Sequence, residues 1–158
     1  GKGKVDSHID SSSIDVAKEV LMTEDILPFK TIIDESDPND YFILVSHLKY
    51  LALDEEYPAS LSSKIMTDLL RNELGYKGII ITDDMEMGAV ANHNDFRSIG
   101  VNAVKAGADI VLVCHEYEHQ QEVYLGLLDA VNNGEISQER IDESIKRIIK
   151  VKLLHLYQ

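Results

Sequence analysis

Gly75-Tyr76-Lys77-Gly78-Ile79-Ile80-Ile81-Thr82-Asp83-Asp84-Met85 decides the fold, because it describes a buried strand that ends on two adjacent carboxylates. Its four consecutive β-branched residues, 79–82, suit a parallel strand covered on both faces. Ligands bind at the carboxyl ends of such strands in barrels and open α/β sheets. Either aspartate alone could cap a following helix, but two of them followed by Met-Glu-Met-Gly favour a functional site.

Composition limits the class of protein. The chain has 158 residues, of which 44% are hydrophobic, which suffices for one ordinary domain, and it has no apolar run long enough to span a membrane. Its net charge of −13 argues against nucleic acid or an anionic membrane surface as a partner, and is most simply a solvated acidic surface. The single cysteine, Cys114, follows the apolar run 110–113, so we expect a buried core thiol and no disulfide.

Apolar periodicity predicts helices that alternate with strands. Strands are expected at 41–46, 78–82 and 108–114. Helices are expected at 11–23, from a cap at Ser60 to Leu74, at 95–106 with Gly107 closing it, at 117–132 and at 137–156. Helices alternating with continuous apolar strands are typical of a parallel α/β sheet. Residues 1–158 show no linker, so we expect no internal domain boundary.

Three strands are too few for a closed structure. They would leave a hydrophobic sheet edge, whereas a closed (β/α)₈ barrel needs eight strand-helix units and roughly 250 residues. We therefore expect part of a barrel, or a sheet that pairs with another chain. The first residues, Gly1 to Lys4, include no initiator Met or signal peptide, which favours a fragment or a processed product.

Seven motifs then fall in the order seen in glycoside hydrolase family three. They are Asp6-Ser7-His8, Leu27-Pro28-Phe29, Ser46-His47, Pro58-Ala59-Ser60-Leu61-Ser62, Leu70-Arg71-x-x-Leu74-Gly75-Tyr76-x-Gly78, Thr82-Asp83-Asp84-Met85-x-Met87 and Ala106-Gly107-Ala108-Asp109. The chain resembles the bacterial β-N-acetylglucosaminidase (β-hexosaminidase) branch of that family. The resemblance covers nearly the whole chain and implies the C-terminal half of a (β/α)₈ TIM-type barrel.

The resemblance also implies an activity, namely retaining hydrolysis of terminal β-linked N-acetylglucosamine, as in peptidoglycan fragments, with no cofactor. The family nucleophile corresponds to Asp83, which would form a covalent glycosyl-enzyme. The sequence leaves open whether glucose or xylose substrates compete with N-acetylglucosamine. It also leaves the cellular location of the protein open, since the family contains both cytoplasmic and exported or lipid-anchored enzymes.

Asp6 and His8 correspond to the acid/base pair of this branch. An imidazole has a reference pKa of about 6.5, so it can donate and then accept a proton near neutral pH. Asp6 would accept the other ring N–H and fix the tautomer. Taken alone, an Asp-Ser-His sequence near a terminus would more often be idle.

Other side chains are assigned by position. His47 follows a strand, where family members carry a histidine in the sugar pocket, so we expect substrate contact rather than metal binding. Met85 and Met87 could wall the pocket, although a core or lid role is equally plausible. Arg71 is expected to be structural. His115 and His119 are expected to be solvated, and since no carboxylate or third ligand is evidently aimed at them, no metal site is expected there. His93 is expected to be adjacent to the pocket, and His155 to be structural or exposed.

The sequence departs from the family at its beginning. Gly1-Lys2-Gly3-Lys4 stands where a glycine-rich run with a His is common in the family. The family's Lys-His segment just before the acid/base loop, and its Arg and Asp that hold the sugar from earlier strands, are absent. One hypothesis is therefore a catalytic chain completed by the N-terminal half of the barrel. The other is a non-catalytic half-barrel that associates with a second copy. A third, more distant hypothesis is Mg²⁺-dependent phosphoryl chemistry at the paired aspartates.

Overall fold

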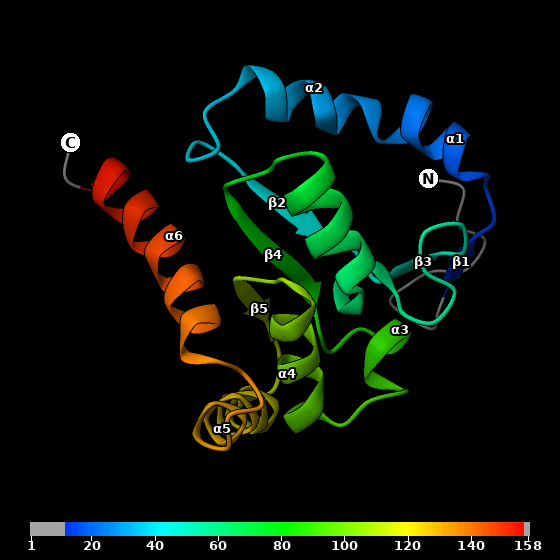
Figure 1. Cartoon of the computed structure of the whole chain (residues 1–158). Coiled ribbons are helices and arrows are strands. Elements are labelled where there is room, and N and C mark those ends of the chain that lie inside the picture. The colour runs from blue at the N-terminus through cyan, green and yellow to red at the C-terminus, as the bar shows by residue number, and fades with distance from the viewer. Residues whose placement is uncertain (1–11, 157–158) are drawn as a thin grey trace.

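A three-stranded parallel sheet forms the centre of the computed structural model, which describes residues 12–156 (Figure 1). The strand order is β2 (Phe42–Val45), β4 (Ile79–Asp84), β5 (Ile110–Leu112). Phe42 pairs with Ile79 and Val45 with Thr82, so β2 and β4 run in register along their shared length. These strands confirm the three predicted from the apolar runs, and β4 extends through both aspartates.

Helices connect the strands in the alternating order that was predicted. α4 (Phe96–Ala106), α5 (Tyr117–Asn132) and α6 (Gln138–Leu156) match the expected helices within one residue at each end. Asp95 caps α4 by accepting a hydrogen bond from the N–H of Ser98 (3.0 Å), and Gly107, at φ +130°, ends it. The short helix α3 (Gly88–Ala91) lies between β4 and α4.

The first described segment corrects the helix predicted over 11–23. β1 (Ser12–Ile14) is a strand that pairs in parallel with β3 (Leu48–Tyr50), and helical structure begins only with α1 (Lys18–Val20). It continues through η1 (Leu21–Asp25) and α2 (Leu27–Glu35). Pairing with a segment more than thirty positions away overrides the local helical pattern. Neither short strand was predicted.

The predicted cap at Ser60 is also wrong. Ser60 lies within a single helical turn, η2 (Ala59–Leu61), and the longer helix η3 (Lys64–Glu73) begins afterwards. Ser62 Oγ accepts the N–H of Ile65 (3.2 Å) and donates to Asp54 Oδ2 (2.6 Å). The hydroxyl of Ser60 is instead used by His47, because tertiary contacts select among several serines that could each cap a helix.

β4 is the most buried strand, as its sequence predicts. Ile80 of β4, and Met85 directly after the strand, lie in the main apolar core with residues of η3 and α4, which cover one face of the sheet. α4 and α5 approach closely at Gly126, where an added Cβ would lie 2.0 Å from the carbonyl oxygen of Arg97. Only a glycine permits this spacing.

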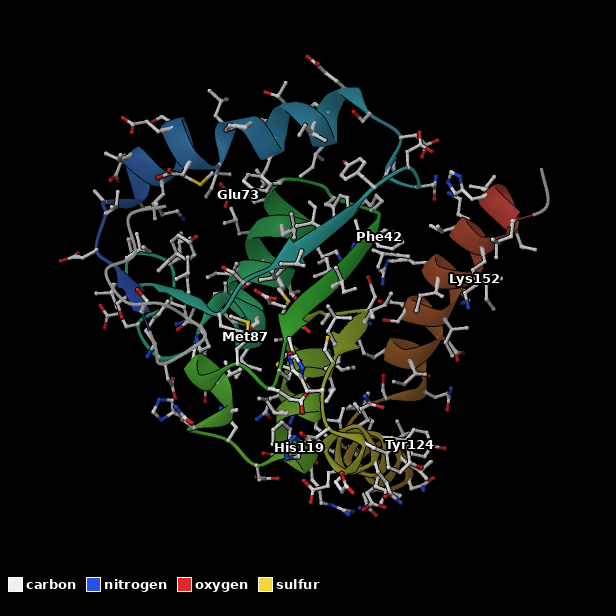
Figure 2. The ribbon with its side chains drawn as sticks, turned by 180° about the vertical axis from the view of Figure 1, so that it is seen from behind. Phe42, Glu73, Met87, His119, Tyr124 and Lys152 are labelled. Carbon is white, nitrogen blue, oxygen red and sulfur yellow. The ribbon has the colours of Figure 1, made fainter. Side chains whose placement is uncertain are left out.

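β2 is only partly buried. β2 is an edge strand of the sheet, and it carries Phe42, which Figure 2 labels. Phe42 and Leu44 are 47% and 53% exposed. Other large apolar side chains are also exposed on α2, at Leu27, Phe29 and Ile32. An apolar cavity of about 490 Å³ lies among η1, α2, β2 and η3, away from the paired aspartates. The hydrophobic edge expected from three strands is thus present.

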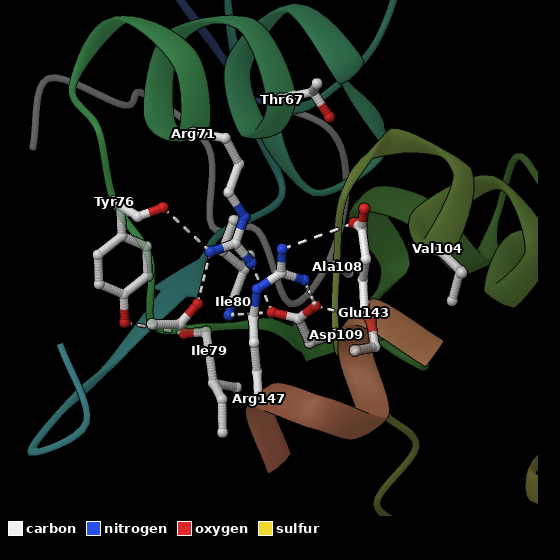
Figure 3. A network of polar contacts seen from close by, with 12 residues as sticks. Thr67, Arg71, Tyr76, Ile79, Ile80, Val104, Ala108, Asp109, Glu143 and Arg147 are labelled. Atoms are coloured by element: carbon white, nitrogen blue, oxygen red, sulfur yellow. Dashed lines mark hydrogen bonds and ion pairs between the residues drawn. The ribbon is translucent and has the colours of Figure 1, made fainter. Parts of the chain in front are cut away.

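A buried ionic network ties α6 to η3 and the sheet (Figure 3). Asp109 accepts hydrogen bonds from Arg71 Nη2 (2.5 Å), Arg147 Nη1 (2.9 Å), the Ser144 hydroxyl (2.6 Å) and the backbone N–H of Ile80 (3.0 Å). The guanidinium of Arg71 also donates to the carbonyl oxygen of Gly78. The structural role predicted for Arg71 is confirmed.

Candidate active site

The end of β4 contains a β-bulge that decides where its carboxylates point. Ile81 pairs with Ile110 but Asp84 pairs with Leu112, so three steps along β4 match two along β5. Thr82, which is fully buried, fills the gap, because its Oγ1 accepts the N–H of Leu112 at 3.1 Å. A side-chain hydroxyl thus replaces a missing backbone acceptor, which explains physically why Thr precedes the two aspartates.

Asp83 occupies the bulge and is partly buried. Its Oδ1 accepts the N–H of Asp84 at 2.9 Å, which fixes the carboxylate relative to its own backbone. The position at the carboxyl end of a central parallel strand is the one expected for a nucleophile. Asp6 and His8 lie outside the described residues, so their acid/base roles stay predictions.

His47 is buried, at 1% exposure, and both of its ring nitrogens have partners. Nε2 lies 2.8 Å from the carbonyl oxygen of Asp84, and Nδ1 lies 2.7 Å from Ser60 Oγ. A carbonyl can only accept, so Nε2 carries the proton and Nδ1 accepts from the hydroxyl in the neutral ring. Burial lowers the pKa of His47, which favours this neutral form. His47 therefore contacts the backbone directly after Asp83.

Met85 and Met87 are also buried. Met85 has no exposed surface and belongs to the main core, and Met87 is 8% exposed at the start of α3. The role of both residues as substrate contacts stays a prediction. For Met85, the structure confirms the alternative that was considered, namely a position in the core.

Two carboxylates at this edge hold the loop between β5 and α5. Asp84 Oδ1 accepts the N–H of Cys114 (3.2 Å), and its Oδ2 lies 3.1 Å from His115 Nε2. Glu86 accepts the N–H of Glu116 (2.8 Å) and also binds His119 Nδ1 (2.7 Å). The expectation that no carboxylate is aimed at His115 and His119 is therefore wrong, because neighbouring strand ends bring the two loops together.

Hydrogen bonds keep Glu86 charged. Burial alone would raise the pKa of Glu86, but the bonds from His119 and from the backbone N–H groups of the loop outweigh it and lower the pKa to about 2. His119, near the start of α5 (Figure 2), is itself fixed, since its ring stacks on Phe96 of α4. The ring centroids are 3.7 Å apart. Glu86 is thus an ionised anchor for this loop.

Cys114 corrects another expectation. Its side chain is exposed rather than buried, because β5 ends at Leu112 and the chain has already left the sheet. Burial, limited as it is, and the negative charge of Asp84 and Glu86 raise the pKa of the Cys114 thiol. The thiol therefore stays protonated at neutral pH beside the carboxylates.

Sequence reasoning placed both aspartates at the functional end of this strand, but it assigned no role in the site to Ser60, Thr82 or Glu86. A usable signal was present, because polar residues follow each of two neighbouring strands, β4 and β5, whose carboxyl ends must meet. The particular contacts between these residues depend on the β-bulge and on the loop geometry, which the sequence does not show.

Comparison with known proteins decides the family. Residues 1–151 match the family described as "Glycosyl hydrolase family 3 N terminal domain". The chain belongs to glycosyl hydrolase family 3. The resemblance found in the sequence motifs is thereby confirmed, and with it the expectation of half a TIM-type barrel with parallel strands and alternating helices.

Three similar proteins illustrate the match. "Beta-hexosaminidase A" of Pseudoalteromonas piscicida is 31% identical over 96% of this chain and 28% of its own length. The structure of a β-N-acetylglucosaminidase from Paenibacillus sp. str. FPU-7 gives a TM-score of 0.91 at 37% identity, covering 96% of this chain and 28% of that one. Zn-bound CbsA from Thermotoga neapolitana gives 0.87 at 29% identity, with 95% and 32% covered.

This chain therefore spans about a third or less of each of these relatives. No helix among residues 12–156 combines the length and apolar character that crossing a membrane requires.

Proposed function

We propose that this chain carries the nucleophile half of a retaining exo-β-N-acetylglucosaminidase. The observation that supports the proposal is Asp83 on the bulged end of the central strand, in a chain whose relatives are named β-hexosaminidases and β-N-acetylglucosaminidases. Terminal β-linked N-acetylglucosamine, as in peptidoglycan fragments, is the proposed substrate.

The proposed reaction has two steps. In the first, an Asp83 carboxylate oxygen forms a bond to the anomeric carbon while the bond to the leaving oxygen breaks, and His8 gives that oxygen its proton. In the second, water attacks the same carbon, His8 takes the water proton, and the bond to Asp83 breaks. Two inversions at one carbon give net retention. Asp6 would keep the His8 ring oriented.

His47 would act in this reaction as a positioning residue. It is buried and donates to the carbonyl oxygen of Asp84, so it fixes the backbone beside the nucleophile. A hydrogen bond between a ring nitrogen of His47 and the sugar would require that nitrogen to leave its bond with the Asp84 carbonyl or with Ser60. Small errors in a nucleophile's position are costly to the rate, which is why such support matters.

A complete sugar site would need more of the barrel. The exposed Phe42 and Leu44 on the β2 edge and the apolar face of α2 support a further part of the barrel as their cover. A second copy of this chain would cover the same edge without supplying sugar-binding residues. Analytical ultracentrifugation with and without the preceding half of the barrel separates these cases, because only self-association depends on the concentration of this chain alone.

The test of the proposed activity is trapping of the covalent intermediate. The protein carrying this chain, with its complete barrel, is incubated with an activated 5-fluoro-β-N-acetylglucosaminide and followed by intact mass and peptide mapping. We expect one added glycosyl unit on the peptide that contains Asp83. The adduct should be absent in Asp83→Asn and present in Asp34→Asn, a matched change at an exposed aspartate of α2.

The outcomes divide the hypotheses. An adduct mapped to another carboxylate would refute the role of Asp83. Absence of any adduct or turnover with the complete barrel would favour the non-catalytic half-barrel. Activity that depends on Mg²⁺ and acts on phosphate esters would support the phosphoryl alternative.

A further inference from the structure

We infer that the end of β4 and the loop after β5 form a binding site for one zinc-like transition-metal ion, with Asp84, Glu86 and His115 as ligands. One donor atom from each of these side chains lies within 4.8 Å of the other two. Asp84 ends β4 and Glu86 follows it, while His115 lies in the loop after β5, about thirty positions further along the sequence, so the fold assembles the group. The site is distinct from Asp83 and does not depend on the proposed glycosidase activity.

The distances are close to those of a metal site. Asp84 Oδ2 and His115 Nε2 are 3.1 Å apart. Ligands of a tetrahedral zinc with bonds of about 2.0–2.1 Å lie roughly 3.3 Å from one another. The pair is thus already at the required spacing, and Glu86 would close by about 1–1.5 Å from the 4.8 Å limit. His115 can follow, because its side chain is 73% exposed.

Charge is the second, independent observation. The Asp84 and Glu86 side chains are only 13% and 7% exposed, yet within residues 12–156 neither has a Lys or Arg ion-pair partner. In that part of the chain their ion-pair partners are instead the imidazoles of His115 and His119. Asp109 shows the contrast, since it is compensated by arginines. Backbone N–H groups and imidazoles surround these two carboxylates, but no Lys or Arg among residues 12–156 neutralises their charge. A dication bound between them and His115 would do so.

The donor set favours zinc over magnesium. Imidazole nitrogen suits Zn²⁺, Co²⁺ and Ni²⁺, whereas Mg²⁺ and Ca²⁺ prefer oxygen alone. His119 would orient the Glu86 ligand, because its Nδ1 binds the Glu86 carboxylate while its ring stacks on Phe96. Such outer contacts orient metal-binding carboxylates.

Calorimetric titration of Zn²⁺ into the protein carrying this chain tests the inference. We expect one ion per chain, weakened more than about tenfold in His115→Ala, since that change removes a ligand. His155→Ala is the matched control, because His155 also lies near an aspartate, with Nε2 3.5 Å from Asp40 Oδ1, and this exposed pair is in no three-ligand group found among the described residues. Bound Co²⁺ should give a visible spectrum that is lost in the same variant.

Each outcome decides the matter. Loss of binding in His115→Ala with retention in His155→Ala supports the site. Absence of Zn²⁺ binding at about 100 μM, equal affinity in both variants, or equally tight binding of Mg²⁺ would overturn it. Asp84→Asn, which keeps the side-chain shape, provides a second variant, and circular dichroism of each variant checks that folding is unchanged.

Discussion

Replacing Asp109 with alanine should destabilise this protein more than any comparable change at a surface carboxylate. The Asp109 side chain has no exposed surface, and Arg71 and Arg147, which pair with it, are 12% and 25% exposed. Removing one partner of a buried ion pair costs about 3–5 kcal/mol, because it leaves the other charge buried and uncompensated. The backbone N–H of Ile80 would lose its acceptor as well.

The magnitude is large enough to measure directly. A loss of about 3–5 kcal/mol corresponds to a fall in melting temperature of roughly 6–20 °C for a domain of this size. Equilibrium urea denaturation followed by circular dichroism gives the free energy of unfolding, using the complete protein that carries the chain. Asp129→Ala is the control, since its ion pair with Arg97 is about half exposed on both sides and is worth only about 0–1 kcal/mol.

The reasoning would fail if the two alanine variants lost similar free energy. Equal effects within about 1 kcal/mol would mean that the arginines around Asp109 find other partners or water when it is absent. A larger loss in Asp129→Ala would contradict the burial argument altogether. The expected order is therefore the test, and it does not depend on any catalytic activity.

Two further predictions concern the end of β4. Thr82→Val should lower the free energy of unfolding by about 1–3 kcal/mol, because it leaves the buried N–H of Leu112 without its acceptor. Thr82→Ser keeps the hydroxyl and should lower it less. Equal losses of the two variants in urea denaturation would refute the role of the hydroxyl. Because the pKa of Glu86 is lowered to about 2, its stabilising effect is present above its unfolded pKa of about 4.5 and is lost as pH falls towards 2. Unfolding free energies measured from about pH 6 to 3 should therefore fall less steeply in Glu86→Gln than in the unchanged protein, and parallel slopes would contradict this assignment.

Predictions from the sequence succeeded where one local pattern dominates. The four β-branched residues before Asp83 predict the central strand, and the apolar stripes of 117–132 and 137–156 predict α5 and α6. They failed for Ser12–Ile14, whose apolar spacing fits a helix. Pairing with β3 stabilises this segment as a strand by more than its local preference stabilises a helix.

The sequence by itself determined the alternation of strands and helices, the carboxylates that end β4 and the family to which this chain belongs. These follow from periodicity, residue type and motif order, all of which are local properties. Only the tertiary structure decided that Thr82 closes a bulge, that His47 is buried against the carbonyl of Asp84, and that Glu86 meets His119. Each of these contacts joins residues about thirty positions apart, and their geometry depends on how neighbouring strands are registered, which no local pattern specifies.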